Sequence, residues 1–180
     1  MAIFRNRFTS WSQVLAIYAA CAFPIFIWTI PQIIGYASQW LLRLSLWDTL
    51  GVMAYLLANA VVESLLVFLV VMVLALILPV RVYDKVLVPL AAAFATITTI
   101  FVIVLIMTQE RALLYGSLNM TFVSLAVYLV VMGLAYLVIR RNKRVATLIN
   151  GLIDRLVPLV ALYVFFGVLG VALVAMRNLA

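Results

Sequence analysis

The apolar run at residues 50–79 limits what this chain can fold into more than any other feature. It reads LGVMAYLLANAVVESLLVFLVVMVLALILP, and one carboxylate, Glu63, interrupts it near the middle. The hydrocarbon core of a bilayer is about 30 Å thick, and a helix needs roughly 20 residues to cross it. The run is therefore long enough to form a membrane-spanning helix with an ionisable group inside it.

The composition places most of the chain in lipid. Hydrophobic residues make up 69% of the sequence and charged residues 9%, whereas charged residues make up about 25% of an ordinary soluble domain. No segment rich in charge or in Pro, Gly and Ser is long enough to form a separate soluble domain. We therefore expect residues 1–180 to form a single transmembrane helical domain.

Four further apolar runs accompany the first. Their lengths and flanking residues predict an all-α, polytopic membrane protein built as a bundle of five transmembrane helices. Helix boundaries predicted from a sequence are good to about two to four residues. The expected helices cover residues 12–36, 50–80, 86–108, 116–139 and 152–176.

If the five predicted helices cross the membrane, the segments on its two sides contain unequal numbers of lysine and arginine residues. With the N-terminus in the cytoplasm, nine basic residues lie inside and three lie outside. The positive-inside rule favours this orientation, in the cell (cytoplasmic) membrane with the C-terminus outside. Four of the nine, Arg140, Arg141, Lys143 and Arg144, share one loop, so the orientation depends largely on that loop.

The same basic cluster has two interpretations. It is typical of a signal that fixes topology at a cytoplasmic helix end. Alternatively, Arg140, Arg141, Lys143 and Arg144 contact anionic lipid headgroups, which attract each nearby cation by about 1 kcal/mol. Nucleic acid is not an expected partner, because the basic residues lie at the ends of apolar runs and form no stripe on a polar face.

The segment between the first two predicted helices, residues 37–48, is amphipathic. On a helix, Trp40, Leu44 and Trp47 would share one face. The pattern predicts a short interfacial helix between helices 1 and 2 at the outer surface. An aromatic belt that joins two spans is the simpler alternative.

Several residues affect how the helices bend and pack. Pro24 and Pro31 each remove a backbone donor inside the first predicted helix, so we expect that helix to bend or open locally. Small residues spaced three or four apart let two helix backbones approach closely, either within the bundle or with another subunit. The pairs are Ala16 and Ala20, Ala91 and Ala95, and Gly167 and Gly170.

Glu63 is the centre of the candidate intramembrane site. It lies about 20 Å of helix from Leu50 and about 24 Å from Pro79, so neither end brings it near water. Tyr55, Asn59 and Glu63 recur at i, i+4 and i+8 and predict one polar stripe that faces the bundle interior. Without a cation at that depth, we expect Glu63 to be protonated at neutral pH unless water reaches it. The expected neutral partners are Thr96, Thr98 and Thr99 on the third helix and Ser124 and Tyr128 on the fourth.

Two roles remain open for the site formed by Glu63, Asn59, Tyr55, Thr96 and Thr99. In the structural role, the side chains hydrogen-bond across to neighbouring helices and hold the bundle together. In the functional role, Glu63 binds a proton, a cation or the polar part of a substrate. Glu63→Gln separates the two roles. In the functional role it should preserve folding and abolish any transport, whereas loss of folding, with no transport by the wild type, would favour the structural role.

Signatures of an enzyme are absent from the sequence. The chain has no histidine and one cysteine, and it has no nucleotide-binding or nucleophile motif. We therefore expect no catalytic residues, no cofactor and no metal site. The sequence favours a non-enzymatic accessory or assembly subunit of a larger membrane complex, whose partners are other membrane proteins or further copies of this chain. The alternative is a small transporter or permease component that uses Glu63.

Overall fold

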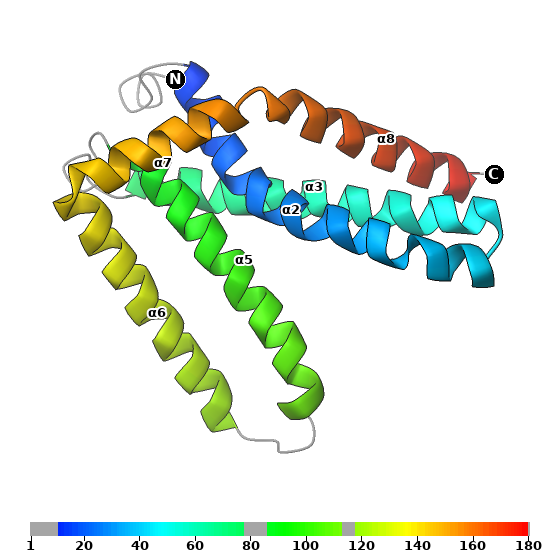
Figure 1. The fold of residues 1–180 in the computed structure, drawn as a ribbon, viewed down its shortest axis with the longest axis horizontal. Helices are drawn as coiled ribbons and strands as arrows, with labels where there is room; N and C mark the ends of the chain where they lie inside the picture. The colour runs from blue at the N-terminus through cyan, green and yellow to red at the C-terminus, as the bar shows by residue number, and fades with distance from the viewer. Residues whose placement is uncertain (1–10, 78–85, 113–117, 180) are drawn as a thin grey trace.

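The computed structural model describes residues 11–77, 86–112 and 118–179, and every regular element in these residues is a helix. Five of the six described helices are long and apolar enough to cross a membrane, all except α7. The all-α fold with five membrane-spanning helices is therefore confirmed, and it fits a multi-pass membrane protein. The predicted helix ends at residues 80 and 116 lie outside the described residues. The helices are α2 (Trp11–Arg43), α3 (Leu46–Ile77), α5 (Leu87–Ala112), α6 (Leu118–Arg141), α7 (Lys143–Leu156) and α8 (Leu159–Leu179) (Figure 1).

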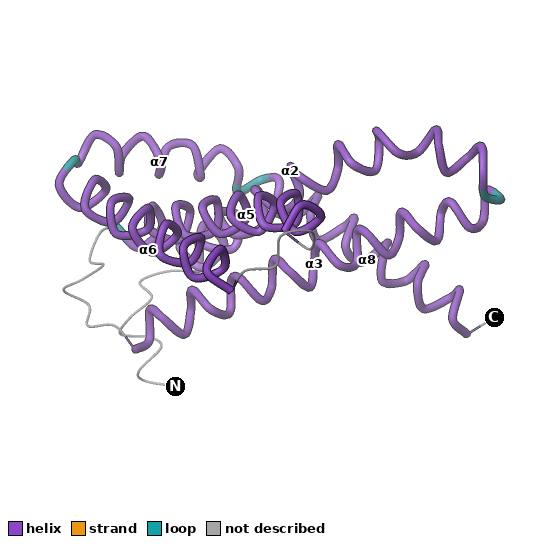
Figure 2. Tube along the Cα trace, turned by 90° about the horizontal axis from the view of Figure 1, so that it is seen from below, coloured by secondary structure: helices purple, strands orange, loops and turns teal. Residues whose placement is uncertain are grey.

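The membrane-spanning helices form two groups that diverge. In one group, α3 packs against both α2 and α8, while α5 and α6 form a hairpin that points away from this group (Figure 1). The groups meet where α5 packs against α2, and α7 contacts α2, α5 and α6 at that end. Short loops connect α2 to α3, α6 to α7 and α7 to α8 (Figure 2). The fold is therefore open at one end and closed at the other.

Two of the three buried clusters in the described residues lie at the closed end, and the third joins α2, α3 and α8. Small side chains dominate the first two clusters, which allows α2, α3 and α5 to approach closely. The predicted contacts of Ala16 and Ala20 and of Ala91 and Ala95 thus lie within this chain. One buried cluster joins Ile17, Cys21, Val71, Ala75, Leu87, Ala91 and Ala95, and a second joins Ala16, Ala20, Ala92, Ile153 and Leu156.

Two glycines set the contact between α3 and α8. A Cβ atom on Gly170 would lie 3.0 Å from the Ala54 carbonyl oxygen and 3.0 Å from the Leu57 Cβ. A Cβ atom on Gly167 would collide with the side chain of Val61. Glycine at these positions therefore lets the two helix backbones lie against each other, as the sequence predicted for small residues in this helix.

The predicted interfacial helix between the first two spans does not form. Residues 37–43 continue α2 to Arg43, and α3 begins at Leu46, before the predicted start at residue 50. Ser45 explains the early start of α3, because its hydroxyl accepts a hydrogen bond from the Asp48 backbone N–H at 3.1 Å. A side chain that satisfies a free N–H group of the first turn favours helix initiation at that point.

The amphipathic helix of this fold is instead α7. Asn142 caps it by accepting a hydrogen bond from the Arg144 backbone N–H at 3.1 Å, and the helix continues through Asn150 and Gly151, just before residue 152, where the last predicted helix was expected to begin. The reason is an apolar face: Ala146, Ile153 and Leu156 are buried, and burial outweighs the turn preference of Asn-Gly. The predicted helix 152–176 is thus two helices, which meet at residues 157–158.

Candidate functional site

A cavity of about 370 Å³ lies between α2, α3 and α5, where the hairpin begins to diverge from the other group. Most of its lining is apolar, and each of the three helices also contributes polar side chains. These are Thr29 and Gln32 of α2, Asn59 and Glu63 of α3, and Thr98 and Thr99 of α5.

Glu63 and Asn59 form a hydrogen-bonded pair on the α3 wall of this cavity. The Asn59 side-chain amide donates to Glu63 Oε1 at 2.7 Å. Glu63 lies about 26 Å of helix from Leu46 and about 21 Å from Ile77, so the pair sits near the middle of the span. Both side chains are exposed. The expectation that Glu63 is hidden among packed helices is therefore wrong for this chain, because the hairpin diverges at this level and leaves α3 uncovered.

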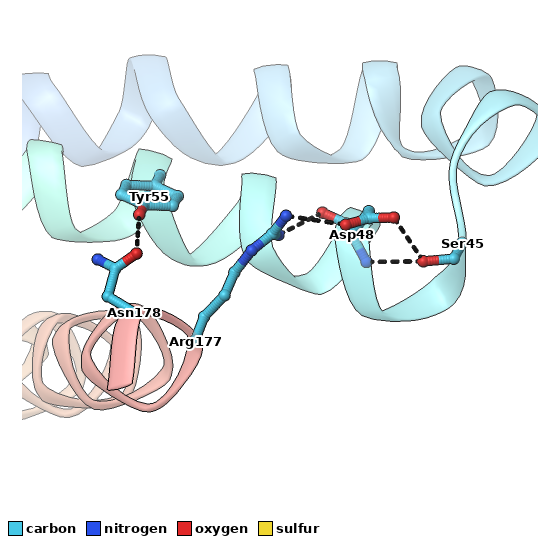
Figure 3. A network of polar contacts seen from close by, with 5 residues as sticks. All are labelled: Ser45, Asp48, Tyr55, Arg177 and Asn178. Carbon is cyan, nitrogen blue, oxygen red and sulfur yellow. Dashed lines mark hydrogen bonds and ion pairs between the residues drawn. The ribbon is translucent and has the colours of Figure 1, made fainter. Parts of the chain in front are cut away.

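The structure brings together part of the predicted polar site. Glu63, Asn59 and Thr99 line one cavity. Tyr55 lies apart, because each step of four residues exceeds one helical turn of 3.6 residues and rotates the stripe around α3. The Tyr55 hydroxyl donates instead to Asn178 Oδ1 of α8 at 3.1 Å (Figure 3). Thr96 is exposed outside the cavity, beside the inward face of α5 that carries the buried Ala95.

Sequence reasoning missed two residues of the cavity, Thr29 and Gln32 of α2. The signal was present in the sequence, since both residues lie within two positions of Pro31. Proline has no backbone N–H, so it leaves the Ile27 carbonyl without its usual helical donor. The helix nevertheless continues through Pro24 and Pro31, and Figure 1 shows α2 changing direction along its length. Thr29 is buried, and its hydroxyl donates to the Ile25 carbonyl at 2.9 Å.

Thr98 has a different partner from the one that the sequence suggested. Its hydroxyl lies 2.9 Å from the Tyr128 hydroxyl of α6. The Tyr128 ring also packs against Phe101, with 4.8 Å between ring centroids. These contacts hold the α5–α6 hairpin together, so Thr98 links the hairpin to the cavity wall and does not bind Glu63.

A second polar cluster joins the start of α3 to the end of α8 (Figure 3). Arg177 Nη2 donates to Asp48 Oδ1 at 2.8 Å, and Arg177 Nη1 donates to the Asp48 carbonyl at 3.4 Å. The Ser45 hydroxyl donates to Asp48 Oδ2 at 2.7 Å. A Cβ atom on Gly51 would collide with the Arg177 guanidinium, so this glycine leaves room for the ion pair.

The predicted basic loop is the junction of two helices. Arg140 and Arg141 end α6, Lys143 and Arg144 begin α7, and all four side chains are exposed. Arg140 Nη1 donates to the Tyr136 hydroxyl at 2.6 Å. The four cations therefore lie together at one end of the hairpin, as the sequence placed them.

The remaining chemistry is sparse. Among the residues that the structure describes, no group of three or more His, Cys, Asp or Glu side chains is placed to hold a metal ion. No protein family model, curated protein or solved structure matches this chain. Its function must therefore be inferred from its own side chains and their arrangement.

Proposed function

We propose that this protein is a non-enzymatic subunit of a larger complex in the cell membrane, and that a partner covers the cavity between the two helix groups. One observation carries the proposal: Asn59 and Glu63 are exposed near the middle of α3. The N-terminus is cytoplasmic in this proposal, because the basic residues of the α6–α7 junction lie on the same side as the start of α2.

The free-energy cost of exposing the Glu63 side chain to lipid favours a partner that covers it. An acidic side chain at the centre of a bilayer costs about 2.5–3.5 kcal/mol on translocon-insertion scales. The Asn59 amide donates a hydrogen bond to one carboxylate oxygen of Glu63. The other polar side chains that line the cavity are Thr29, Gln32, Thr98 and Thr99. A membrane helix that donates to Glu63 would remove both the carboxylate and the cavity wall from lipid, and interhelical hydrogen bonds of this kind contribute about 0.6 kcal/mol on average.

The shape of the hairpin supports the same conclusion. Among the described helices, α6 packs mainly against α5 and α7, and almost none of its membrane-spanning part is buried. A second membrane protein, or a second copy of this chain, would fill the space between the hairpin and α3. In this proposal the partner covers Asn59 and Glu63. An acid in the middle of a membrane helix then has a role in binding the partner and needs no catalytic role.

Site-specific photocrosslinking in cells tests the proposal. A photoreactive residue at Leu66, which lines the cavity, should give a discrete protein adduct. The same residue at Leu129, which is exposed on α6, serves as the matched control and should give lipid adducts. Glu63→Leu should remove the adduct at Leu66. Lipid adducts at both positions, together with a monomeric chain in mild detergent, would contradict the proposal.

A transporter or permease component is the second candidate, and the composition of the cavity favours it. Three helices contribute polar side chains to one cavity, and one of them contains Pro31 beside the polar Gln32. An intramembrane acid is typical of substrate and ion sites in transporters, and Pro31 leaves the Ile27 carbonyl on α2 without its helical donor. In this role Glu63 would carry a proton or a cation, or bind the polar part of a substrate.

Proton flux into liposomes that contain the purified chain and a trapped pH-sensitive dye tests this candidate. Glu63→Gln should abolish the flux, and Glu63→Asp should retain part of it because the carboxylate remains. Asp48→Asn is the control, since Asp48 is a carboxylate outside the cavity. Equal flux in the wild type and in Glu63→Gln would exclude a role for Glu63 in proton transport.

A further inference from the structure

A second, apolar cavity lies on the basic side of the fold, between α3, α5 and α6. Its volume is about 190 Å³. Leu74 lines it and is 40% exposed, so the cavity is a groove that opens to the surrounding lipid. The side chains that carry the argument are Leu74 and Ala75 of α3, Leu90 and Ala93 of α5, and Met132 and Tyr136 of α6.

One row of side chains on α6 continues from this groove to the basic end of the helix. Met132, Tyr136 and Arg140 are spaced four residues apart, so each side chain lies about one turn beyond the one before it along α6. Met132 and Tyr136 line the groove. Arg140 Nη1 donates to the Tyr136 hydroxyl at 2.6 Å, and the guanidinium carbon lies 5.8 Å from the centroid of the Tyr136 ring. Tyr136 thus forms part of the groove wall and also fixes the arginine at the end of the groove.

Three further cations lie close to this arginine along the chain: Arg141 at the end of α6, and Lys143 and Arg144 at the start of α7. The Arg140 side chain is exposed, so its guanidinium has donors free for a ligand beyond the one that Tyr136 accepts. A planar guanidinium matches the geometry of a phosphate, and several cations beside one leaflet attract anionic headgroups.

We propose that this groove and Arg140 form a binding site for one anionic phospholipid. An acyl chain lies in the groove between α3, α5 and α6, and the headgroup phosphate binds the guanidinium of Arg140. The arrangement suits a phospholipid because the apolar and cationic parts follow one another along α6, as a tail and a charged head follow one another in a leaflet. This site is separate from the cavity around Glu63 and does not depend on the proposed function.

Native mass spectrometry of the full chain in mild detergent, titrated with phosphatidylglycerol or phosphatidylcholine, tests the proposal. The wild type should retain phosphatidylglycerol in preference to phosphatidylcholine. Arg140→Gln should weaken phosphatidylglycerol binding by about fivefold or more, which corresponds to the attraction of one cation. Arg141→Gln is the matched control, because it removes the same charge from the next residue, outside the row that lines the groove, and it should have a smaller effect.

Two further variants separate a defined site from general attraction. Tyr136→Phe keeps the ring and removes the hydroxyl that holds Arg140, so binding should fall by less than in Arg140→Gln. Ala93→Leu fills the groove and should weaken the binding of both lipids. Equal losses in Arg140→Gln and Arg141→Gln, or equal binding of the two lipids by the wild type, would overturn the proposal. If Ala93→Leu fails to fold, the comparison of the two arginines still decides.

Discussion

Asp48 and Arg177 join the first turn of α3 to the last turn of α8 through an ion pair of 2.8 Å between Asp48 Oδ1 and Arg177 Nη2. The two residues are far apart in the sequence, and the antiparallel course of the helices brings them together. Each charge also suits its own helix, because acids are favoured near a helix N-terminus and cations near a C-terminus. The pair therefore marks the register in which α8 lies along α3.

A double-mutant cycle on this pair should show weak coupling. The two side chains are 32% and 44% exposed, and exposed ion pairs contribute about 0.2–1 kcal/mol. We expect Asp48→Asn and Arg177→Gln to lower the free energy of unfolding in mild detergent with a coupling energy in that range. Coupling of several kcal/mol would mean that the pair is shielded from water.

Gly170→Ala should destabilise the contact between α3 and α8. The added methyl group would press on the Ala54 carbonyl and the Leu57 side chain, and overpacking of this kind costs about 1–3 kcal/mol. Gly133→Ala is the control, since nothing lies within 4 Å of a Cβ at that position. The control should leave stability unchanged or raise it by up to about 1 kcal/mol. Thermal unfolding in detergent measures both, and equal effects would contradict the observed packing.

The buried face of α7 can be tested with Ile153→Ala. Ile153 is 3% exposed and packs with Ala16 and Ala20 of α2, and removing a buried branched side chain costs about 2–5 kcal/mol. Leu148, on the same helix, is 74% exposed, so Leu148→Ala should change stability by less than about 0.5 kcal/mol. If both variants lose the same stability, α7 does not dock as described.

Labelling of single cysteines checks the proposed orientation. The native Cys21 is fully buried and should not react with a membrane-impermeant maleimide. On intact cells, Leu42→Cys at the end of α2 should be labelled, whereas Thr147→Cys on α7 should react only after lysis. The reverse pattern would place the N-terminus outside, against the distribution of basic residues.

Length and composition were enough to predict the five membrane-spanning helices. The apolar runs reach the roughly 20 residues with which a helix crosses a bilayer, and a helix satisfies the backbone groups of such a run within the run itself. The small pairs Ala16 and Ala20 and Ala91 and Ala95 were also predicted as contacts, because only small side chains allow helices to approach closely. Both features depend only on the length of an apolar run and on the size of single side chains, and both can be read from the sequence.

The tertiary structure alone decided which faces of the helices meet. In a membrane helix nearly every side chain is apolar, so the pattern does not distinguish a face that meets another helix from a face that meets lipid. For that reason the sequence placed Glu63 inside the bundle, whereas the divergence of the hairpin exposes it on a cavity wall. The same ambiguity concealed the groove that ends at Arg140, since a groove exists only once three helices have taken their positions.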